Sequence, residues 1–247
     1  SLMRQLYTET RRALSRGLQN PIAREEVIRA TKRAAAEALE YRGFLEDELA
    51  DLWNSRGNDY FVRERAEDIA WHTEAIADHD LANGALVLVR QAGESPIGNA
   101  TQIFVHARDE ANTFAKICAA LDTLDLSVHD ARIYSDDDGS TLDTFYVLQS
   151  DGSSLDPHPD TFSEIRQTIQ HNLLQPTAKT VTRHMPRTVR AFTIPTQIHF
   201  SKDRLSGLTT LEISTADRPG LLARIGSVLS RHGVTVQGAK IQTLGER

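Results

Sequence analysis

The chain has 247 residues, a length that accommodates one large or two modest domains. Apolar residues make up 40% and charged residues 25%, which excludes a chain that is disordered, collagen-like or coiled-coil throughout. A net charge of −6 and an aromatic content of 6% argue against a nucleic-acid-binding or base-stacking protein.

Two further observations concern location. No stretch approaches the roughly 18 consecutive apolar residues of a membrane-spanning helix, and the N-terminus lacks the pattern of a secretory signal. The single cysteine, Cys118, excludes an intrachain disulfide. We therefore expect a cytoplasmic protein without a membrane partner.

The first 82 residues are predicted to be helical. Leucines at a helical spacing predict one helix over residues 2–17, and the apolar period predicts a second from Pro21 to Gly43. Leu45, Leu49, Leu52 and Trp53 predict a short third helix, and a fourth is expected over residues 65–80. His72 and His79 lie in the fourth helix, but a spacing of seven is too long for one metal ion. We predict no metal site.

Strand patterns begin after the helical residues. Apolar runs and alternation predict strands at residues 86–91, 101–107, 126–134 and 142–149, and helices at 110–123 and 159–174. The order after the first strand is βαββα, the opening of an antiparallel sheet that carries helices on one face. The sequence thus predicts an α+β fold.

The sequence also contains an internal repeat. Residues 101–135 align without a gap on residues 209–243, and the identities fall at strand spacing, then helix spacing, then strand spacing. The identical pairs are Thr101/Thr209, Asp109/Asp217, Ala115/Ala223, Ile117/Ile225, Leu121/Leu229, Val128/Val236, Ala131/Ala239 and Ile133/Ile241. We call residues 83–175 copy one and residues 192–247 copy two, with a linker at 176–191 and the helical residues at 1–82.

Copy two lacks counterparts of the hairpin strand and second helix of copy one. We therefore expect the chain to be a fragment of a longer protein, with copy two incomplete. An incomplete sheet leaves an unpaired edge. We expect copy one, a neighbouring chain or strand exchange to cover it, so that a homo-oligomer through this edge is an open alternative.

The loop before the helix of copy two has the sequence Asp217-Arg218-Pro219-Gly220-Leu221. Asp217 is expected to cap the helix, Pro219 is compatible with its first turn, and Gly220 permits close approach of a ligand. The positive end of the helix suits an α-carboxylate. This loop, within a strand–helix–strand repeat, resembles that of the ACT family, whose βαββαβ modules of ferredoxin-like topology sense amino acids.

Copy one departs from this pattern. Its matching residues are Asp109-Glu110-Ala111-Asn112-Thr113, with neither proline nor glycine and with an acid in place of the arginine. Asp109 is expected to remain as a helix cap. A ligand that carries a carboxylate is therefore favoured at the loop of copy two.

A wider resemblance covers nearly the whole chain. Residues 126–133 and 143–148, the helical stretches 59–63 and 69–72, and residues 238–247 resemble the C-terminal tandem ACT region of the bacterial PII uridylyltransferase/uridylyl-removing enzyme family, with residues 1–82 as the tail of the preceding hydrolase domain or a connector. That family adds UMP to the nitrogen-signalling protein PII when glutamine is low and removes it when glutamine is high. The resemblance implies that Mg²⁺ and UTP bind catalytic domains that are absent here.

We therefore expect a regulatory, glutamine-sensing region without a catalytic residue or a cofactor of its own. Ligand contacts are expected from the loop of copy two, from a facing strand, and secondarily from copy one. They are Asp217, Arg218, Pro219, Gly220 and Leu221; Gly233, Val234 and Thr235; and Asp109, Asn112, Thr113, Ser127 and Val128. The alternative is a ligand-free structural or dimerisation module.

A free-standing enzyme would need clustered catalytic side chains. Cys118 lies on the apolar face of its helix and is expected in the core, and the histidines are scattered singly. The run Asp136-Asp137-Asp138 is expected to form a solvated hairpin turn, since it lacks the spaced glutamate of an EF-hand loop.

Overall fold

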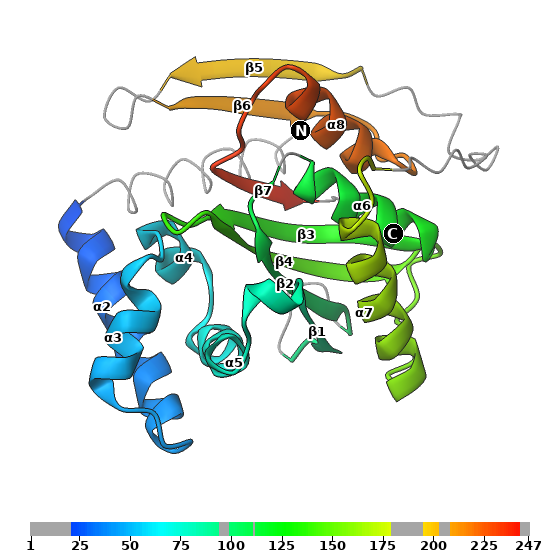
Figure 1. Ribbon diagram of the computed structural model, residues 1–247. Helices are drawn as coiled ribbons and strands as arrows, with labels where there is room; N and C mark the ends of the chain where they lie inside the picture. The colour runs from blue at the N-terminus through cyan, green and yellow to red at the C-terminus, as the bar shows by residue number, and fades with distance from the viewer. Residues whose placement is uncertain (1–20, 94–98, 111, 179–194, 203–207, 243–247) are drawn as a thin grey trace, which may run out of the picture.

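The computed structural model describes residues 21–93, 99–110, 112–178, 195–202 and 208–242 (Figure 1). The α+β class is confirmed. Its helices are α2 (Pro21–Glu40), α3 (Glu46–Asn54), α4 (Asn58–Arg63), α5 (Ala66–Ala77), the 3-10 turn η1 (Leu81–Asn83), α6 (Thr113–Thr123), α7 (Pro159–Leu173) and α8 (Leu221–Arg231). Its strands are β1 (Leu86–Gln91), β2 (Thr101–Arg108), β3 (Leu126–Ser135), β4 (Ser140–Gln149), β5 (Gln197–Lys202), β6 (Thr209–Ser214) and β7 (Gly238–Gln242).

The predicted elements lie close to these bounds, and the apolar period failed to locate one helix, which the wider resemblance marks as helical at residues 59–63. The short helix α4 falls between the predicted third and fourth helices, where Tyr60 and Phe61 are buried. Its six residues are too few for a helical period to stand out in the sequence. The helix expected at residues 2–17 and most of the expected linker lie outside the described residues.

Four strands of copy one and one strand of copy two form a single antiparallel sheet. Its order is β1-β2-β4-β3-β7, whereas β5 and β6 pair as a separate ribbon. In copy one the preceding strand β1 fills the edge next to β2, which a βαββαβ chain would fill with its last strand. In copy two, one edge of strand β7 pairs with β3 of copy one. This is one of the three ways in which we expected the edge of copy two to be covered.

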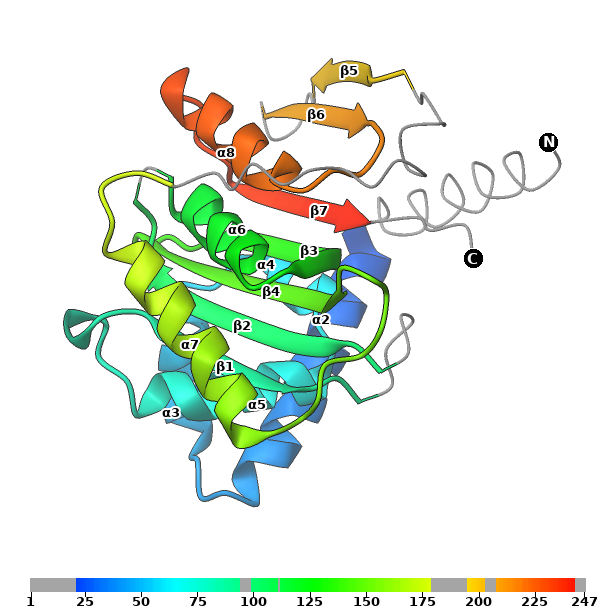
Figure 2. The ribbon, with the colours of Figure 1, turned by 90° about the vertical axis from the view of Figure 1, so that its right-hand side faces the viewer.

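The pairing of β3 with β7 relates the two copies by an approximate twofold axis. Arg132 lies opposite Lys240, its own counterpart in the repeat, while Ala131 lies opposite Ile241 and Ile133 opposite Ala239. Above this strand pair α6 packs on α8, the matching helix (Figure 2). We call the β3–β7 pair and the α6–α8 contact together the seam.

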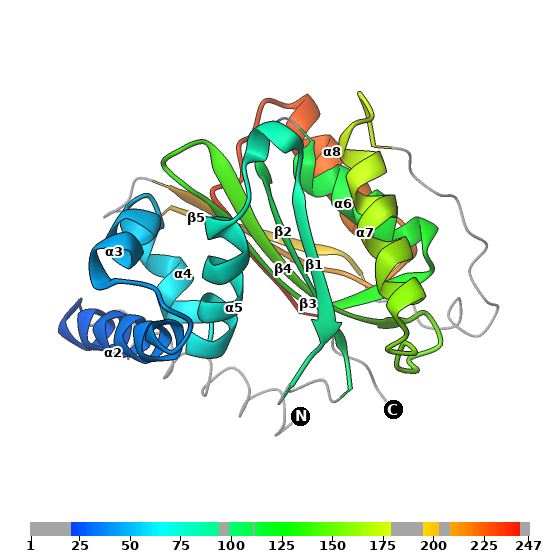
Figure 3. The ribbon, with the colours of Figure 1, turned by 60° about the horizontal axis from the view of Figure 1, so that its bottom comes forward.

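The helices α2–α5 form a layer on the other face of the sheet (Figure 3). We call α2–α5 the helical segment and the sheet face toward it the back face. The contact contains a shared apolar core, to which the sheet contributes Phe104, Tyr134 and Leu142, each at most 4% exposed. The expected arrangement, with helices on one face only, is therefore wrong for copy one, whose sheet is covered on both faces.

Alternation in the strands explains why the helical segment covers copy one alone. The back face of copy one presents Phe104 and Tyr134, whereas the matching positions of copy two hold Glu212 and Gln242. Burying an aromatic ring removes about 150–250 Å² from water, but burying a carboxylate or amide without a partner costs free energy. A helical layer therefore gains little by packing on copy two.

Two clusters that the sequence singled out have structural roles. The Asp136 side chain is buried and paired with Arg56 of the helical segment, so the expectation of a fully solvated turn is wrong at this residue. His72 is fully buried, stacks on Phe104 at 3.7 Å between ring centroids and hydrogen-bonds the Tyr60 hydroxyl through Nδ1 at 2.9 Å. Cys118 is buried, as expected.

Asp143 is a charged side chain in the core of copy one. It lies on β4, is 1% exposed and accepts a hydrogen bond from Thr141 Oγ1. Burial raises its pKa to about 7, opposed by the Thr141 hydrogen bond, while the nearby Asp109 raises it further. The fold therefore favours the neutral form of this carboxyl group.

We expect stability to depend on pH through Asp143. Its pKa is higher in the folded than in the unfolded chain, so the protonated carboxyl group favours the folded state. This contribution to the free energy of unfolding is complete below about pH 4 and is lost as the pH rises to about 7. The Asp143→Asn variant should lose this dependence, with a slope that differs from the parent by at most about 1.4 kcal/mol per pH unit. Urea denaturation between pH 4.5 and 8 measures it, and parallel profiles would contradict the assignment.

Candidate functional site

The loop between β6 and α8 faces copy one across the seam. Asp217 interacts electrostatically with His129 of β3, where burial lowers the pKa of the imidazole and the Asp217 carboxylate opposes that effect. The Gly220 amide donates a hydrogen bond of 3.0 Å to Asp122 Oδ1, at the end of α6. The hydrogen bond places the loop of copy two against α6 of copy one at one end of the seam, and the electrostatic effect places His129 of β3 in the same region.

Gly220 is the N-cap of α8 and takes a left-handed conformation, with φ at 75°. No side chain of the loop caps α8 in the usual manner, so the expectation that Asp217 caps this helix is wrong. The reason is geometric: the turn from Arg218 to Leu221, closed by a hydrogen bond of 3.0 Å, separates Asp217 from the first helical turn. Asp217, Arg218 and Pro219 are exposed, Gly220 is buried and Leu221 is half-buried.

The matching loop of copy one has the same backbone form at its last residue. Asn112 is the N-cap of α6 with φ at 73°, so asparagine replaces the glycine without a change of conformation. Asp109 does not cap α6, contrary to expectation; its amide donates to the Gly139 carbonyl at 2.9 Å. The Thr113 hydroxyl donates to the Glu110 carbonyl at 3.0 Å, so Thr113 closes its own loop.

The residues expected on a facing strand of copy two lie elsewhere. Gly233, Val234 and Thr235 precede β7 and follow α8, so its 11 residues, about 16 Å of helix, separate them from Gly220. Gly233 is left-handed, with φ at 65°, and Val234 donates to the Leu229 carbonyl at 3.0 Å. These residues terminate α8 rather than face the loop of their own copy.

The strand that does face the loop of copy two is β3. Ser127 and Val128 lie near the start of this strand and are half-buried, and the pairing of β3 with β4 shifts register between Val128 and Asp130. The residue within this bulge is His129, whose imidazole is subject to the charge of Asp217. Sequence reasoning did not select His129 and Asp122. The repeat aligns them with Gln237 and Ser230, and this difference in chemistry is the signal that could have singled them out.

The other end of the seam holds the loop of copy one. The Ser135 amide donates to the Gln237 carbonyl at 3.3 Å, and the Ser135 hydroxyl donates to the Val236 carbonyl at 3.1 Å. The β3–β4 hairpin that follows Ser135 also receives the Asp109 amide. The twofold relation thus produces two related ends, and at this second end the end of β3 bonds copy two while the loop of copy one bonds the neighbouring hairpin.

Among the described residues, no group of three or more histidine, cysteine, aspartate or glutamate side chains is arranged to hold a metal ion. In the same part of the chain, no helix combines the length and the hydropathy that crossing a membrane requires.

Comparisons with known proteins identify relatives over the full length. Residues 23–75 match the family described as the uridylyltransferase GlnD fifth domain, and residues 209–247 match the ACT domain family. No solved structure matches. The helical segment and copy two thus each match a known family, in the order that the wider resemblance predicted.

The relatives are bifunctional uridylyltransferase/uridylyl-removing enzymes. Those of Azotobacter vinelandii and Stutzerimonas stutzeri are 45% identical and that of Pseudomonas aeruginosa (strain LESB58) is 44% identical, each over the whole chain. The chain spans 28% of the length of each. It is thus homologous to a C-terminal part of these enzymes.

The left-handed N-cap of α8 gives a test of the site's backbone. Gly220→Asn should change the free energy of unfolding little, because Asn112 adopts the same conformation in copy one. Gly220→Val should destabilise the protein by about 1–2 kcal/mol or more, since a β-branched residue disfavours this region. Urea denaturation of both variants measures the difference; equal losses would contradict the matched geometry.

Proposed function

We propose that this chain, homologous over its whole length to the C-terminal part of bifunctional uridylyltransferase/uridylyl-removing enzymes, is a regulatory region that binds glutamine at the seam. The observation that supports this most is the hydrogen bond of 3.0 Å between the Gly220 amide, in the β6–α8 loop of copy two, and Asp122 of copy one. A ligand bound between two bodies interacts differently with their alternative placements, which is the requirement for allosteric control.

The chemistry of this end of the seam suits a free amino acid. Backbone amides at the start of α8 and the positive end of the helix favour an α-carboxylate. Asp217 offers a carboxylate to an ammonium group and is exposed. Asp122 already bonds the Gly220 amide, so we propose that the ligand carboxylate competes with Asp122 for this donor.

The two ends of the seam are unequal in this respect. Ser230 occupies the position in copy two that matches Asp122, so no carboxylate stands at the corresponding place opposite Asn112. In copy one, however, Glu110 adds a negative charge and Thr113 closes the loop. We therefore propose the loop of copy two as the glutamine site and that of copy one as a secondary candidate.

The activity of the whole enzyme is part of the same proposal. By resemblance, the regulated reactions are addition of UMP to the PII protein and its removal, with Mg²⁺ and UTP bound by domains outside this chain. No residue of this chain is assigned a catalytic role. Its part is to bind the effector and to change its own conformation.

Titration calorimetry with L-glutamine tests the proposal. We expect binding by the parent chain, about threefold to tenfold tighter binding by Asp122→Ser, which removes the competing carboxylate, and weaker binding by Asp217→Asn. Ser230→Asp, the mirror substitution at the other end of the seam, should leave the affinity unchanged.

D-glutamine serves as the stereochemical control. Failure of every variant to bind, with native circular dichroism retained, would reject the proposal for this chain. The specific observation that favours the alternative, a ligand-free structural or dimerisation module, is that the Gly220 amide already has a protein partner. Equal affinity of the parent and Asp122→Ser would reject the competition.

A further inference from the structure

A stripe of buried polar side chains runs along the helical segment toward the back face. Glu64, Asp68 and His72 follow one another at intervals of four residues, and each is at most 4% exposed. Asp68 pairs with Arg90 of β1 and accepts a hydrogen bond of 3.0 Å from Gln102 of β2. The helical segment is thus held to several strands by charged or polar contacts as well as by its apolar core.

Within this stripe, Glu64 is bound by two side chains of β3. Its carboxylate accepts a hydrogen bond of 2.8 Å from Arg132 and one of 3.2 Å from the Tyr134 hydroxyl, both on β3. Arg132 also donates to the Arg63 carbonyl at 3.0 Å. Since Arg63 ends α4 and Glu64 is its C-cap, Arg132 holds the junction between α4 and α5.

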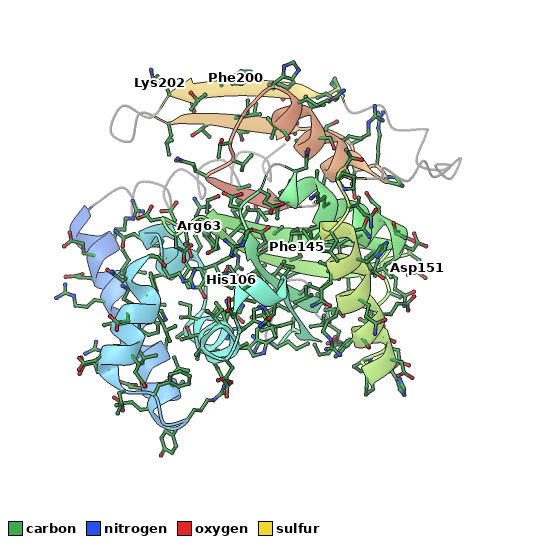
Figure 4. The ribbon with its side chains drawn as sticks, in the orientation of Figure 1. Arg63, His106, Phe145, Asp151, Phe200 and Lys202 are labelled. Atoms are coloured by element: carbon green, nitrogen blue, oxygen red, sulfur yellow. The ribbon has the colours of Figure 1, made fainter. Side chains whose placement is uncertain are left out.

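Arg132 also lies at the centre of the seam. It is the residue of β3 that pairs with Lys240 of β7, at the twofold axis between the copies. Arg63, which this side chain contacts, lies on the helical segment beyond the back face (Figure 4). Arg132 thus joins the strand of copy one that pairs with copy two to a helix junction in the layer beyond the back face.

The energetics make this contact intolerant of displacement. The Glu64 side chain is fully buried and that of Arg132 is 16% exposed. Separating such a pair leaves a buried charge without its partner, which is strongly unfavourable. Burial raises the pKa of Glu64 to about 7, although Arg132 opposes this effect. Because separating the buried pair is unfavourable, a shift of β3 must either carry the α4–α5 junction with it or break the Glu64–Arg132 pair.

We propose that Arg132 is a positioning residue through which a change at the seam reaches the α4–α5 junction. The inference extends the proposed function by giving the route of regulation, and its test uses no ligand. Failure of glutamine binding and failure of this coupling are therefore separate results.

The test perturbs the seam at α8. A Cβ at Gly226 would lie 2.9 Å from Phe114 Cδ1 and 3.1 Å from Ala115 Cβ, so Gly226→Ala requires Phe114 to turn and α6 and α8 to adjust their packing at the seam. Hydrogen exchange followed by mass spectrometry measures protection of residues 58–77, with α7 as the reference. We expect Gly226→Ala to speed exchange at 58–77 about fivefold or more, with little change in α7.

The coupling should disappear when the pair is replaced. In a Glu64→Gln/Arg132→Met background, Gly226→Ala should leave exchange at residues 58–77 within about twofold of that background. The matched control is Asp68→Asn/Arg90→Met, which removes a pair of the same chemistry on the outer strand β1 and should preserve the response.

Three results would overturn the inference: no response to Gly226→Ala, a response that persists without the Glu64–Arg132 pair, or equal loss in the control background. A uniform rise that includes α7 counts as no specific response. If Gly226→Ala does not fold, Asp122→Ser perturbs the seam instead, since it removes the bond to the Gly220 amide. If the Glu64/Arg132 double variant does not fold, Arg132→Lys replaces it, because lysine cannot contact the Glu64 carboxylate and the Arg63 carbonyl with one planar fork.

Discussion

The antiparallel pairing of β3 with β7 is the constraint on which the architecture depends. It fixes the register of copy two against copy one, places α8 beside α6, and sets the helix-start loop of copy two against α6. Because the register is centred on a matched pair of residues, both ends of the seam have the same backbone plan. Their chemistry differs only through side chains that the repeat has changed.

Copy one is a three-layer unit, whereas α2–α5, the helices described before the sheet, leave the back face of copy two uncovered. The helical segment buries aromatic side chains against copy one and adds the pairs Glu64–Arg132, Asp68–Arg90 and Arg56–Asp136. The seam consists of one strand pair and one helix pair. A force applied at the seam therefore acts on copy two against a body that includes both copy one and the helical segment.

The repeat made much of this fold predictable, because apolar spacing survives in both copies. Apolar periodicity located most strands and helices, and the repeat matched the strand–helix–strand stretch 101–135, with its loop, to residues 209–243. The cap assignments failed for Asp109 and Asp217, since a short turn separates each from its helix. Partners between distant residues, such as Asp122 with Gly220, have no sequence signal, because nothing local records which helix end meets which loop.

The two copies share the left-handed backbone conformation at two matched positions, even though the residue types there differ. Among the described residues, the two non-glycine residues with positive φ are Asn112 and Asp125, and their counterparts in copy two are Gly220 and Gly233. Asparagine and aspartate tolerate the left-handed region because their short side chains hydrogen-bond locally. The absence of glycine from the loop of copy one therefore did not mean a different backbone.

The seam has a consequence for synthesis on the ribosome. Copy one and the helical segment emerge from the ribosome before copy two and can fold while copy two is still being made, since domains generally fold from the N-terminus onward. Throughout that interval β3 is a sheet edge that awaits β7, about a hundred residues later in the chain. Because β3 and β7 are matching strands of the repeat, the exposed β3 edge of one nascent chain can also pair with a strand of a neighbouring nascent chain. Pairing between chains on adjacent ribosomes therefore competes with the β3–β7 pairing within each chain.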